Sequence, residues 1–119
     1  MKPLSVILVE DDFELGKLFQ EVLEMGGLKV EWIQDGRLAL QRLANVTPEI
    51  LVLDLHLPEV SGMDILQFIR QDERFAYMRI AVVTADGLRA QMIEDQVDLV
   101  MLKPVGMNQL LGLVKRLTG

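Results

Sequence analysis

The run Ile50-Leu51-Val52-Leu53-Asp54 decides the fold of this chain. Its first four residues are all apolar and lack the alternation of a strand with one solvated face, which indicates a strand that is buried on both faces. Such strands are typical of parallel sheets that helices cover on both sides. The acid that ends the run, Asp54, is then expected at the carboxyl edge of the sheet.

Four other apolar runs, at residues 4–9, 28–33, 79–84 and 99–102, indicate further strands. Helical periodicity follows each strand. After the first one, apolar residues recur at positions 15, 18, 19, 22 and 23, which is the spacing of an amphipathic helix. A fourth helix is expected at about 88–96. This alternation predicts one doubly wound α/β domain over residues 1–119, with five parallel strands.

The composition excludes several classes of function. The net charge is −6, and the pI is about 4.7. Direct binding of nucleic acid by this domain is therefore not expected, because a phosphate backbone is bound by clustered Lys and Arg. The chain has no cysteine, which excludes a thiolate nucleophile and a cysteine zinc site. No apolar run reaches the ~18 residues that span a bilayer, so we expect no membrane contact and a cytoplasmic protein.

Polar and charged side chains stand where four of the predicted strands end. In chain order they are Glu10, Asp11 and Asp12, then Asp54, then Thr84, then Lys103. In open parallel sheets the ligand site lies beyond the carboxyl ends of the strands. With the flavodoxin-like strand order 2-1-3-4-5, all of these residues converge on one crevice.

The charges of this group predict a bound cation. Carboxylates within ~5 Å of one another repel by roughly 3 kcal/mol per pair at an effective dielectric constant of ~20. They stay ionised only if a cation neutralises them. The ligand atoms on offer are hard oxygens, which favours Mg²⁺, with Mn²⁺ as a substitute, over zinc or copper. With Lys103 as a second positive charge, the group is suited to holding a phosphoryl group in transfer to Asp54.

Four segments resemble the receiver domains of bacterial response regulators, the CheY-like proteins of two-component signalling. They are Val9-Glu10-Asp11-Asp12, Leu53-Asp54-Leu55-His56-Leu57-Pro58 with Gly62 downstream, Thr84-Ala85, and Lys103-Pro104. The resemblance covers nearly the whole chain. It lies in the order and the spacing of the four segments, since each alone is a weak signal.

The resemblance implies a signalling domain rather than an enzyme with a separate substrate. Asp54 would accept a phosphoryl group from a sensor histidine kinase or a histidine phosphotransfer protein. Thr84 and Lys103 would contact the phosphoryl oxygens. The response would pass to an output domain or a target that the sequence does not identify, and a homodimer is left open.

A metal site is also implied by the resemblance. Glu10 and Asp11 would bind Mg²⁺, Asp11 more directly, together with Asp54 and the backbone carbonyl of His56. The His56 ring is expected at the mouth of the pocket. Asp12 is interpreted as partly a helix cap. Trp32, near the end of the second predicted strand, is expected at the edge of the sheet, with no indication that it stacks on a ligand.

Two departures from the family pattern fall on the side that receivers use for signalling. The segment from Thr84 to Lys103 is short for the family. The position three residues before Lys103, usually an aromatic switch residue, is Val100. Both cast doubt on the usual coupling between the threonine, here Thr84, and an aromatic residue. Neither affects the expectation that Asp54 is phosphorylated.

Alternative functions share the fold. A pseudo-receiver would keep the architecture as an interaction module without phosphorylation. A haloacid-dehalogenase-type phosphatase needs a second Asp two residues after the nucleophile, where this chain has His56, and an acidic pair after the lysine, where Pro104 and Val105 stand. A flavin mononucleotide binder would need hydroxyls and amides in the first loop, which here is acidic.

Overall fold

The computed structural model describes residues 2–119 and contains one parallel five-stranded sheet in the order β2-β1-β3-β4-β5. All four neighbouring pairs of strands are parallel, which confirms the predicted fold class. The strands are β1 (Ser5–Val9), β2 (Lys29–Ile33), β3 (Ile50–Leu53), β4 (Arg79–Thr84) and β5 (Leu99–Leu102).

Within residues 2–119, five α-helices and two short 3-10 turns follow the strands. They are α1 (Phe13–Met25), α2 (Gly36–Leu43), α3 (Gly62–Arg70), the turn η1 (Glu73–Phe75), α4 (Gly87–Ile93), the turn η2 (Glu94–Gln96) and α5 (Met107–Thr118). None of the helices within residues 2–119 combines the length and the apolar composition needed to cross a bilayer.

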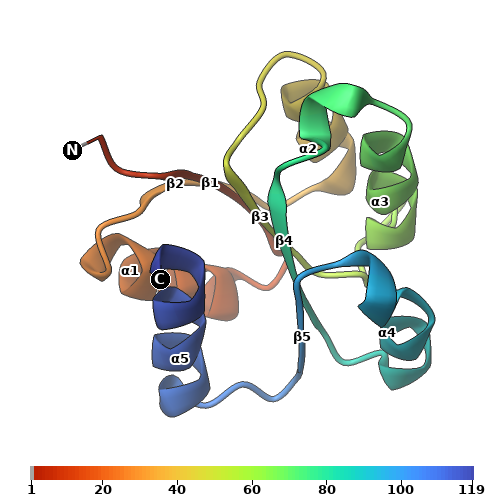
Figure 1. Cartoon of the computed structure of the whole chain (residues 1–119). Helices are drawn as coiled ribbons and strands as arrows, with labels where there is room; N and C mark the ends of the chain where they lie inside the picture. Colours follow the sequence, from red (N-terminus) through yellow and green to blue (C-terminus); the bar gives the residue numbers. More distant parts are fainter. Residues whose placement is uncertain (1) are drawn as a thin grey trace.

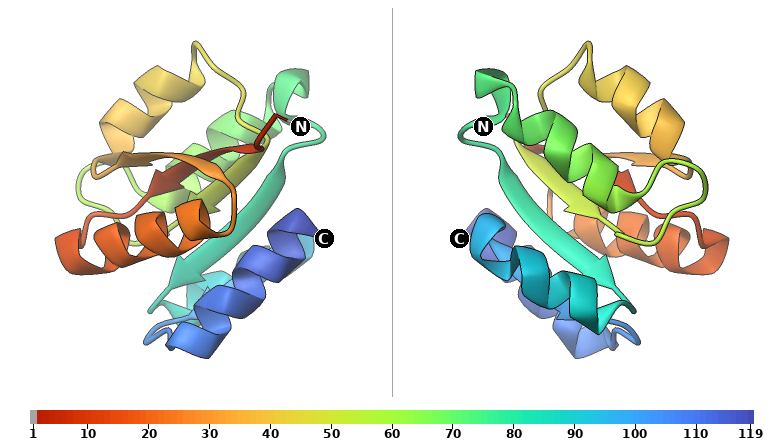
Figure 2. Two further views of the ribbon diagram at one scale, coloured as in Figure 1. Left: turned by 90° about the vertical axis from the view of Figure 1, so that its left-hand side faces the viewer. Right: turned by 90° about the vertical axis from the view of Figure 1, so that its right-hand side faces the viewer.

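The helices form two layers, one on each face of the sheet. Helices α1 and α5 lie on one face, and α2, α3 and α4 lie on the other (Figures 1 and 2). Each layer has its own apolar core, one with Phe19 and Leu113 and the other with Leu43 and Ile65. All four residues of β3 are buried, as the unbroken apolar run predicts.

The strands end where the sequence places them, to within a residue, but the fourth helix is shorter than the expected 88–96. It runs as an α-helix only to Ile93, and residues 94–96 form η2. The chain then has to return to the sheet at Asp98, whose backbone N–H donates to the Ile80 carbonyl at 2.9 Å. The few residues between Ile93 and Asp98 leave room for only one tight turn, which is η2.

The loop after β3 is pressed against the end of its own strand. A side chain on Gly62 would place its Cβ 2.4 Å from the Asp54 carbonyl oxygen, so only glycine allows this approach. The Gly62 N–H donates to the Leu55 carbonyl at 2.9 Å. Ser61 and Asp64 form a capping box that starts α3 there. This packing fixes the backbone around Asp54.

Candidate functional site

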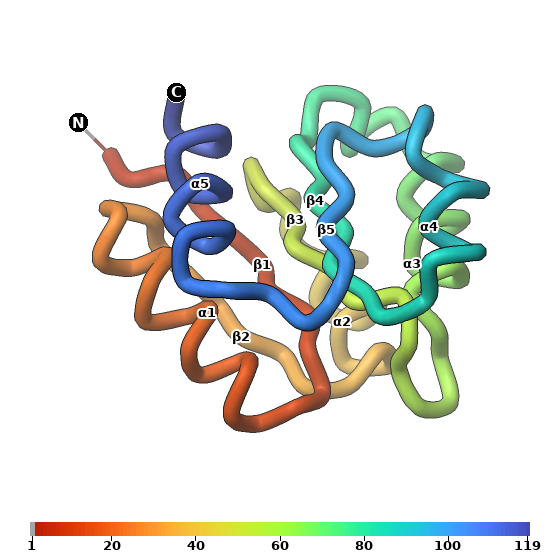
Figure 3. The backbone as a smooth tube through the Cα atoms, turned by 90° about the horizontal axis from the view of Figure 1, so that it is seen from below, coloured from red at the N-terminus to blue at the C-terminus, as the bar shows by residue number. Residues whose placement is uncertain are grey.

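The carboxylates at the ends of β1 and β3 converge, as the topology predicts. Figure 3, viewed from the end where the strands finish, shows the turns after β1, β3, β4 and β5 gathered around one point. One carboxylate oxygen each of Glu10, Asp11 and Asp54 lies within 4.8 Å of the other two. Glu10 and Asp54 are buried, whereas Asp11 is exposed to solvent.

Lys103 joins two of these carboxylates. Its Nζ lies 2.9 Å from Glu10 Oε1 and 2.9 Å from Asp54 Oδ2. One ammonium group therefore faces three carboxylates, and negative charge remains in excess at the site. The excess is greatest on the side of Asp11, for which no ion pair is found in the described part of the chain.

Burial and charge shift the pKa values of this group. Burial raises the pKa of Glu10 to about 7, against the lowering effect of hydrogen bonds from Lys103 and from the Asp12 N–H. Burial lowers the pKa of Lys103, but its hydrogen bonds to Glu10 and Asp54 outweigh this, and the net shift is upward. Lys103 therefore stays charged, whereas Glu10 lies near its titration point at neutral pH.

Main-chain contacts hold Asp54 in place. Its N–H donates to the Val9 carbonyl of β1 at 3.1 Å. Its Oδ1 accepts the His56 N–H at 3.0 Å, while Oδ2 accepts from Lys103. His56 itself is exposed and lines the same hollow as Asp54, in keeping with its expected place at the pocket mouth.

A hollow of about 480 Å³ opens above the acceptor candidate. The side chain of Asp54 is only 4% exposed, but it reaches the floor of this hollow. The lining residues are Asp11, Asp12, Asp54, His56, Ala85, Asp86 and Lys103. The space is open and most of its lining residues are charged, and Lys103 among them suits a small anionic group that enters from solvent or from a partner protein.

Thr84 lies behind this lining. It is fully buried at the end of β4, and its hydroxyl oxygen accepts the Asp86 N–H at 3.1 Å. Its carbonyl accepts the Lys103 N–H at 2.9 Å, which ties the ends of β4 and β5 together. The structure therefore groups Glu10, Asp11, Asp54 and Lys103, and connects Thr84 to the group through Lys103 and Asp86.

Near the site, Asp86 was not singled out by the sequence, and the contact that Trp32 makes was not expected. Asp86 lines the hollow and caps α4 by accepting the Arg89 N–H at 3.0 Å. An Asp-Gly pair before a helix is an ordinary capping signal. Trp32 donates its indole N–H to the Glu10 carbonyl at 2.9 Å. No local pattern indicated this contact, since it joins residues 22 positions apart.

The donor set fits a hard divalent cation. It consists of three carboxylates at short range, two of them in a buried setting, beside an open hollow. Mg²⁺ and Mn²⁺ prefer such oxygen ligands, and Mg²⁺ keeps several water molecules when it binds one or two carboxylates. Within residues 2–119, no other group of three acidic or histidine side chains comes as close together.

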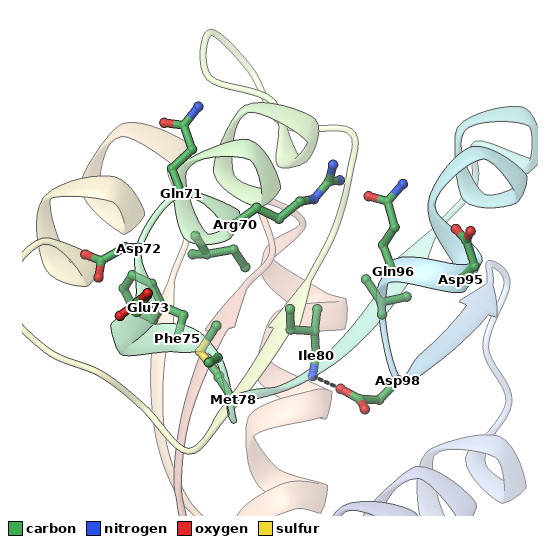
Figure 4. A pocket seen from close by; sticks show the side chains of 13 residues that line it. Arg70, Gln71, Asp72, Glu73, Phe75, Met78, Ile80, Asp95, Gln96 and Asp98 are labelled. Atoms are coloured by element: carbon green, nitrogen blue, oxygen red, sulfur yellow. Dashed lines mark hydrogen bonds between the residues drawn. The ribbon is translucent and has the colours of Figure 1, made fainter.

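A second hollow, of about 510 Å³, lies near the opposite ends of the strands (Figure 4). Its floor is apolar and includes Phe75, Met78 and Ile80, and Arg70 and Gln96 stand on its rim. Asp98 on the same rim already accepts the Ile80 N–H at 2.7 Å. This hollow holds none of the residues that the strand ends bring together.

Comparisons with known proteins agree with this geometry. The family model described as the response regulator receiver domain matches residues 6–115. The polar-differentiation response regulator DivK of Brucella anthropi is 30% identical over 87 residues, which cover 73% of this chain and 71% of DivK. The transcriptional regulatory protein TrcR of Mycobacterium tuberculosis is 33% identical over 121 residues, which cover 96% of this chain and 46% of TrcR.

The fold has close counterparts among solved structures. The chemotaxis response regulator CheY4 of Vibrio cholerae superimposes with a TM-score of 0.86, covering 97% of this chain and 98% of that protein. At 20% sequence identity, that likeness supports the fold alone. The match of the family model over most of the sequence establishes the family. This chain belongs to the response regulator receiver domains of two-component signalling.

Proposed function

We propose that this domain takes a phosphoryl group onto the carboxylate of Asp54, in a reaction that depends on Mg²⁺. The observation that carries the proposal is the setting of this one carboxylate. Asp54 ends the central strand, accepts a hydrogen bond from the Lys103 ammonium at 2.9 Å, and lies within 4.8 Å of the carboxylates of Glu10 and Asp11. It also reaches an open hollow that a donor could enter.

The donor would be a phosphohistidine of a sensor histidine kinase or of a histidine phosphotransfer protein. A carboxylate oxygen of Asp54 forms the new bond to phosphorus, and the bond from phosphorus to the imidazole nitrogen breaks. The electron pair of that bond leaves with the imidazole. Lys103 offsets the charge of the phosphoryl oxygens, and the Thr84 hydroxyl keeps its own proton to donate to one of them.

Glu10, Asp11, Asp54 and the backbone carbonyl of His56 would hold the metal ion. When bound, Mg²⁺ supplies the positive charge that the phosphoryl oxygens require. Asp11 is the exposed member of the group and faces the hollow, which supports its assignment as the more direct ligand. Glu10 is buried between Lys103 and the Asp12 N–H, which supports a role in setting the local charge.

The chain as a whole, residues 1–119, would act as one receiver domain. Its phosphorylated form would change its contacts with an output domain or a separate target, in the cytoplasm where histidine kinases use ATP. Regulation through phosphorylation is what separates this function from that of a pseudo-receiver. The identity of the output, the identity of the kinase and any self-association depend on surfaces and partners outside this site.

Intact mass after incubation with acetyl phosphate and Mg²⁺ tests the proposal. The wild-type chain should gain one phosphoryl group, and Asp54→Asn should gain none. Asp35→Asn is the matched control, because Asp35 caps α2 by accepting the Arg37 N–H, and asparagine caps helices equally well. It should label like the wild type. A wild-type chain that binds neither donor nor metal would indicate a pseudo-receiver, and labelling of Asp54→Asn would move the acceptor elsewhere.

A further inference from the structure

The only tryptophan of the chain lies against the acidic turn that follows β1. Trp32 belongs to β2, where it pairs with Leu8 of β1. Its indole N–H donates to the carbonyl of Glu10 at 2.9 Å. Its ring lies beside Phe13, the first residue of α1, with 5.5 Å between the ring centroids. The indole thus touches both ends of the turn that carries Glu10, Asp11 and Asp12.

Space for the indole is provided by Gly16, one turn into α1. A Cβ on Gly16 would lie 2.2 Å from the indole carbon Cζ2 and 2.5 Å from Nε1. Such an approach is sterically excluded, so any side chain at position 16 would displace the ring of Trp32. The contact of the indole with Glu10 therefore depends on a glycine in a different element.

The hydrogen bond to the Glu10 carbonyl has a specific consequence for Asp11. The Glu10 carbonyl and the Asp11 N–H belong to one planar peptide group. A bond that fixes the direction of this carbonyl restricts the whole plane, and with it the position of the Asp11 Cα from which the side chain leaves the backbone. The Glu10 N–H is fixed as well, by the Ile33 carbonyl at 3.1 Å.

Every other polar group of Glu10 has a different partner. Its Oε1 accepts from Lys103 and its Oε2 accepts the Asp12 N–H at 3.1 Å. Among the hydrogen bonds of the described residues, the indole N–H is the one that reaches the Glu10 carbonyl. Within residues 2–119, no other hydrogen bond holds the peptide between Glu10 and Asp11.

We propose that Trp32 is a positioning residue, which orients the peptide between Glu10 and Asp11 so that their carboxylates converge on the metal site. This inference rests on the proposed function, because it concerns the affinity of the site for Mg²⁺. It assigns Trp32 no contact with the metal or with the phosphoryl group. Its effect is to hold the ligands in place before the ion arrives, as outer partners of metal ligands do.

The variant Trp32→Phe tests this, because it keeps an aromatic ring in the space over Gly16 and removes the N–H. Titration calorimetry should show Mg²⁺ affinity reduced about tenfold, the lower end of the range for lost outer-shell partners. The Mg²⁺ concentration for half-maximal labelling by acetyl phosphate should rise by the same factor. The labelling rate at saturating Mg²⁺ should stay unchanged, since the indole touches no reacting atom.

Two further variants separate the hydrogen bond from general packing. Phe13→Leu removes the ring beside the indole and leaves the N–H, so it should keep the affinity of the wild type. Gly16→Ala displaces the indole while Trp32 remains, so it should lose about as much affinity as Trp32→Phe. The double variant should then be no weaker than either single variant, because both break the same contact.

A measurement on the wild-type chain tests the inference without requiring that any variant folds. With ¹⁵N labelling, the single tryptophan gives one indole N–H resonance. During an Mg²⁺ titration it should shift with the same midpoint as the amide of Asp11. An indole resonance that stays fixed while the Asp11 amide moves would overturn the inference, as would a folded Trp32→Phe variant with unchanged affinity. A wild-type chain that binds no Mg²⁺ would instead refute the proposed function itself.

Discussion

Lys103 reaches across β4 to Asp54, and its Nζ lies 2.9 Å from the carboxylate oxygen Oδ2. The two residues follow β5 and β3, which are not neighbours in the sheet. The same ammonium lies 2.9 Å from Glu10 Oε1, at the end of β1. One lysine thus connects the ends of three strands, and its removal would leave two buried carboxylates without their shared cation.

Replacing this lysine should therefore lower both stability and activity. We expect Lys103→Met to reduce the free energy of unfolding by about 2–3 kcal/mol, somewhat less than a fully buried pair would lose, because the Lys103 side chain is 20% exposed. Labelling by acetyl phosphate should slow by about a hundredfold. Urea denaturation and intact mass measure the two effects. Lys115→Met, at an exposed position in the last turn of α5, should change neither.

Removal of an acid should have the opposite effect on the metal-free protein. Asp11 is exposed and adds negative charge to a group that already holds two buried carboxylates. Asp11→Asn should raise the free energy of unfolding by about 1 kcal/mol, the repulsion expected in a well-solvated setting. The same variant should lose most of the stabilisation that Mg²⁺ gives the wild type. Denaturation with Mg²⁺ and with chelator separates the two effects, and a less stable metal-free variant would contradict the prediction.

Glu10 should make the stability of the metal-free protein depend on pH. Its pKa is about 7 in the folded chain, above the ordinary value of 4.5, so the native state binds more protons than the unfolded state between these values. The contribution of Glu10 to stability is then fully present below pH 4.5 and is lost as pH rises through about 7. Affinity for Mg²⁺ should rise over the same window, because the metal needs the ionised carboxylate.

Urea denaturation in chelator, repeated at several pH values, checks the sign of this effect. The matched variant is Glu10→Gln, which keeps the shape of the side chain and cannot titrate. It should flatten the pH profile in this window and weaken Mg²⁺ binding less than Asp11→Ala does, because Asp11 is the proposed direct ligand. A wild-type profile that rises between mildly acidic and neutral pH would show that another group dominates.

The convergence of the strand ends could be predicted from the sequence, and the reason is topological. Asp54, Thr84 and Lys103 stand directly after apolar runs, and parallel strands bring their carboxyl ends to one edge whatever the details of packing. Trp32 was expected at the edge of the sheet, with no indication that it stacks on a ligand. Its contact with Glu10 depends on the space over Gly16, which no local pattern reveals.

The fourth helix shows a second limit of sequence reasoning. Apolar spacing continues past Ile93 to Val97, and both residues do pack in the same core. The α-helix nevertheless ends at Ile93, because the hydrogen bond between Asp98 and Ile80 returns the chain to the sheet. Apolar periodicity indicates which residues are buried. It does not reveal a hydrogen bond to a neighbouring strand that ends the helix.

The last prediction concerns how phosphorylation would reach the surface. The Thr84 hydroxyl accepts the Asp86 N–H at 3.1 Å, and Asp86 in turn caps α4 through the Arg89 N–H. A phosphoryl group on Asp54 would attract this hydroxyl by a charge-assisted hydrogen bond. The contact with Asp86 would weaken as the hydroxyl turns, and the first turn of α4 would lose part of its anchor. Val100 has no ring to move into the vacated space, and it already packs against the core.

We therefore expect the response to beryllofluoride, a phosphoryl mimic, to be concentrated in residues 85–93. Hydrogen exchange should change there and stay nearly constant around Val100. Thr84→Val keeps the shape of the side chain and removes the hydroxyl, so it should abolish the change in α4 while leaving beryllofluoride bound. Val100→Tyr adds the ring that receivers usually carry, and should extend the change into β5. A shift between two states requires contacts that differ between them, and changes in exchange mark where those contacts lie. Large changes at Val100 with none in α4 would therefore contradict a response that runs through Thr84, Asp86 and α4.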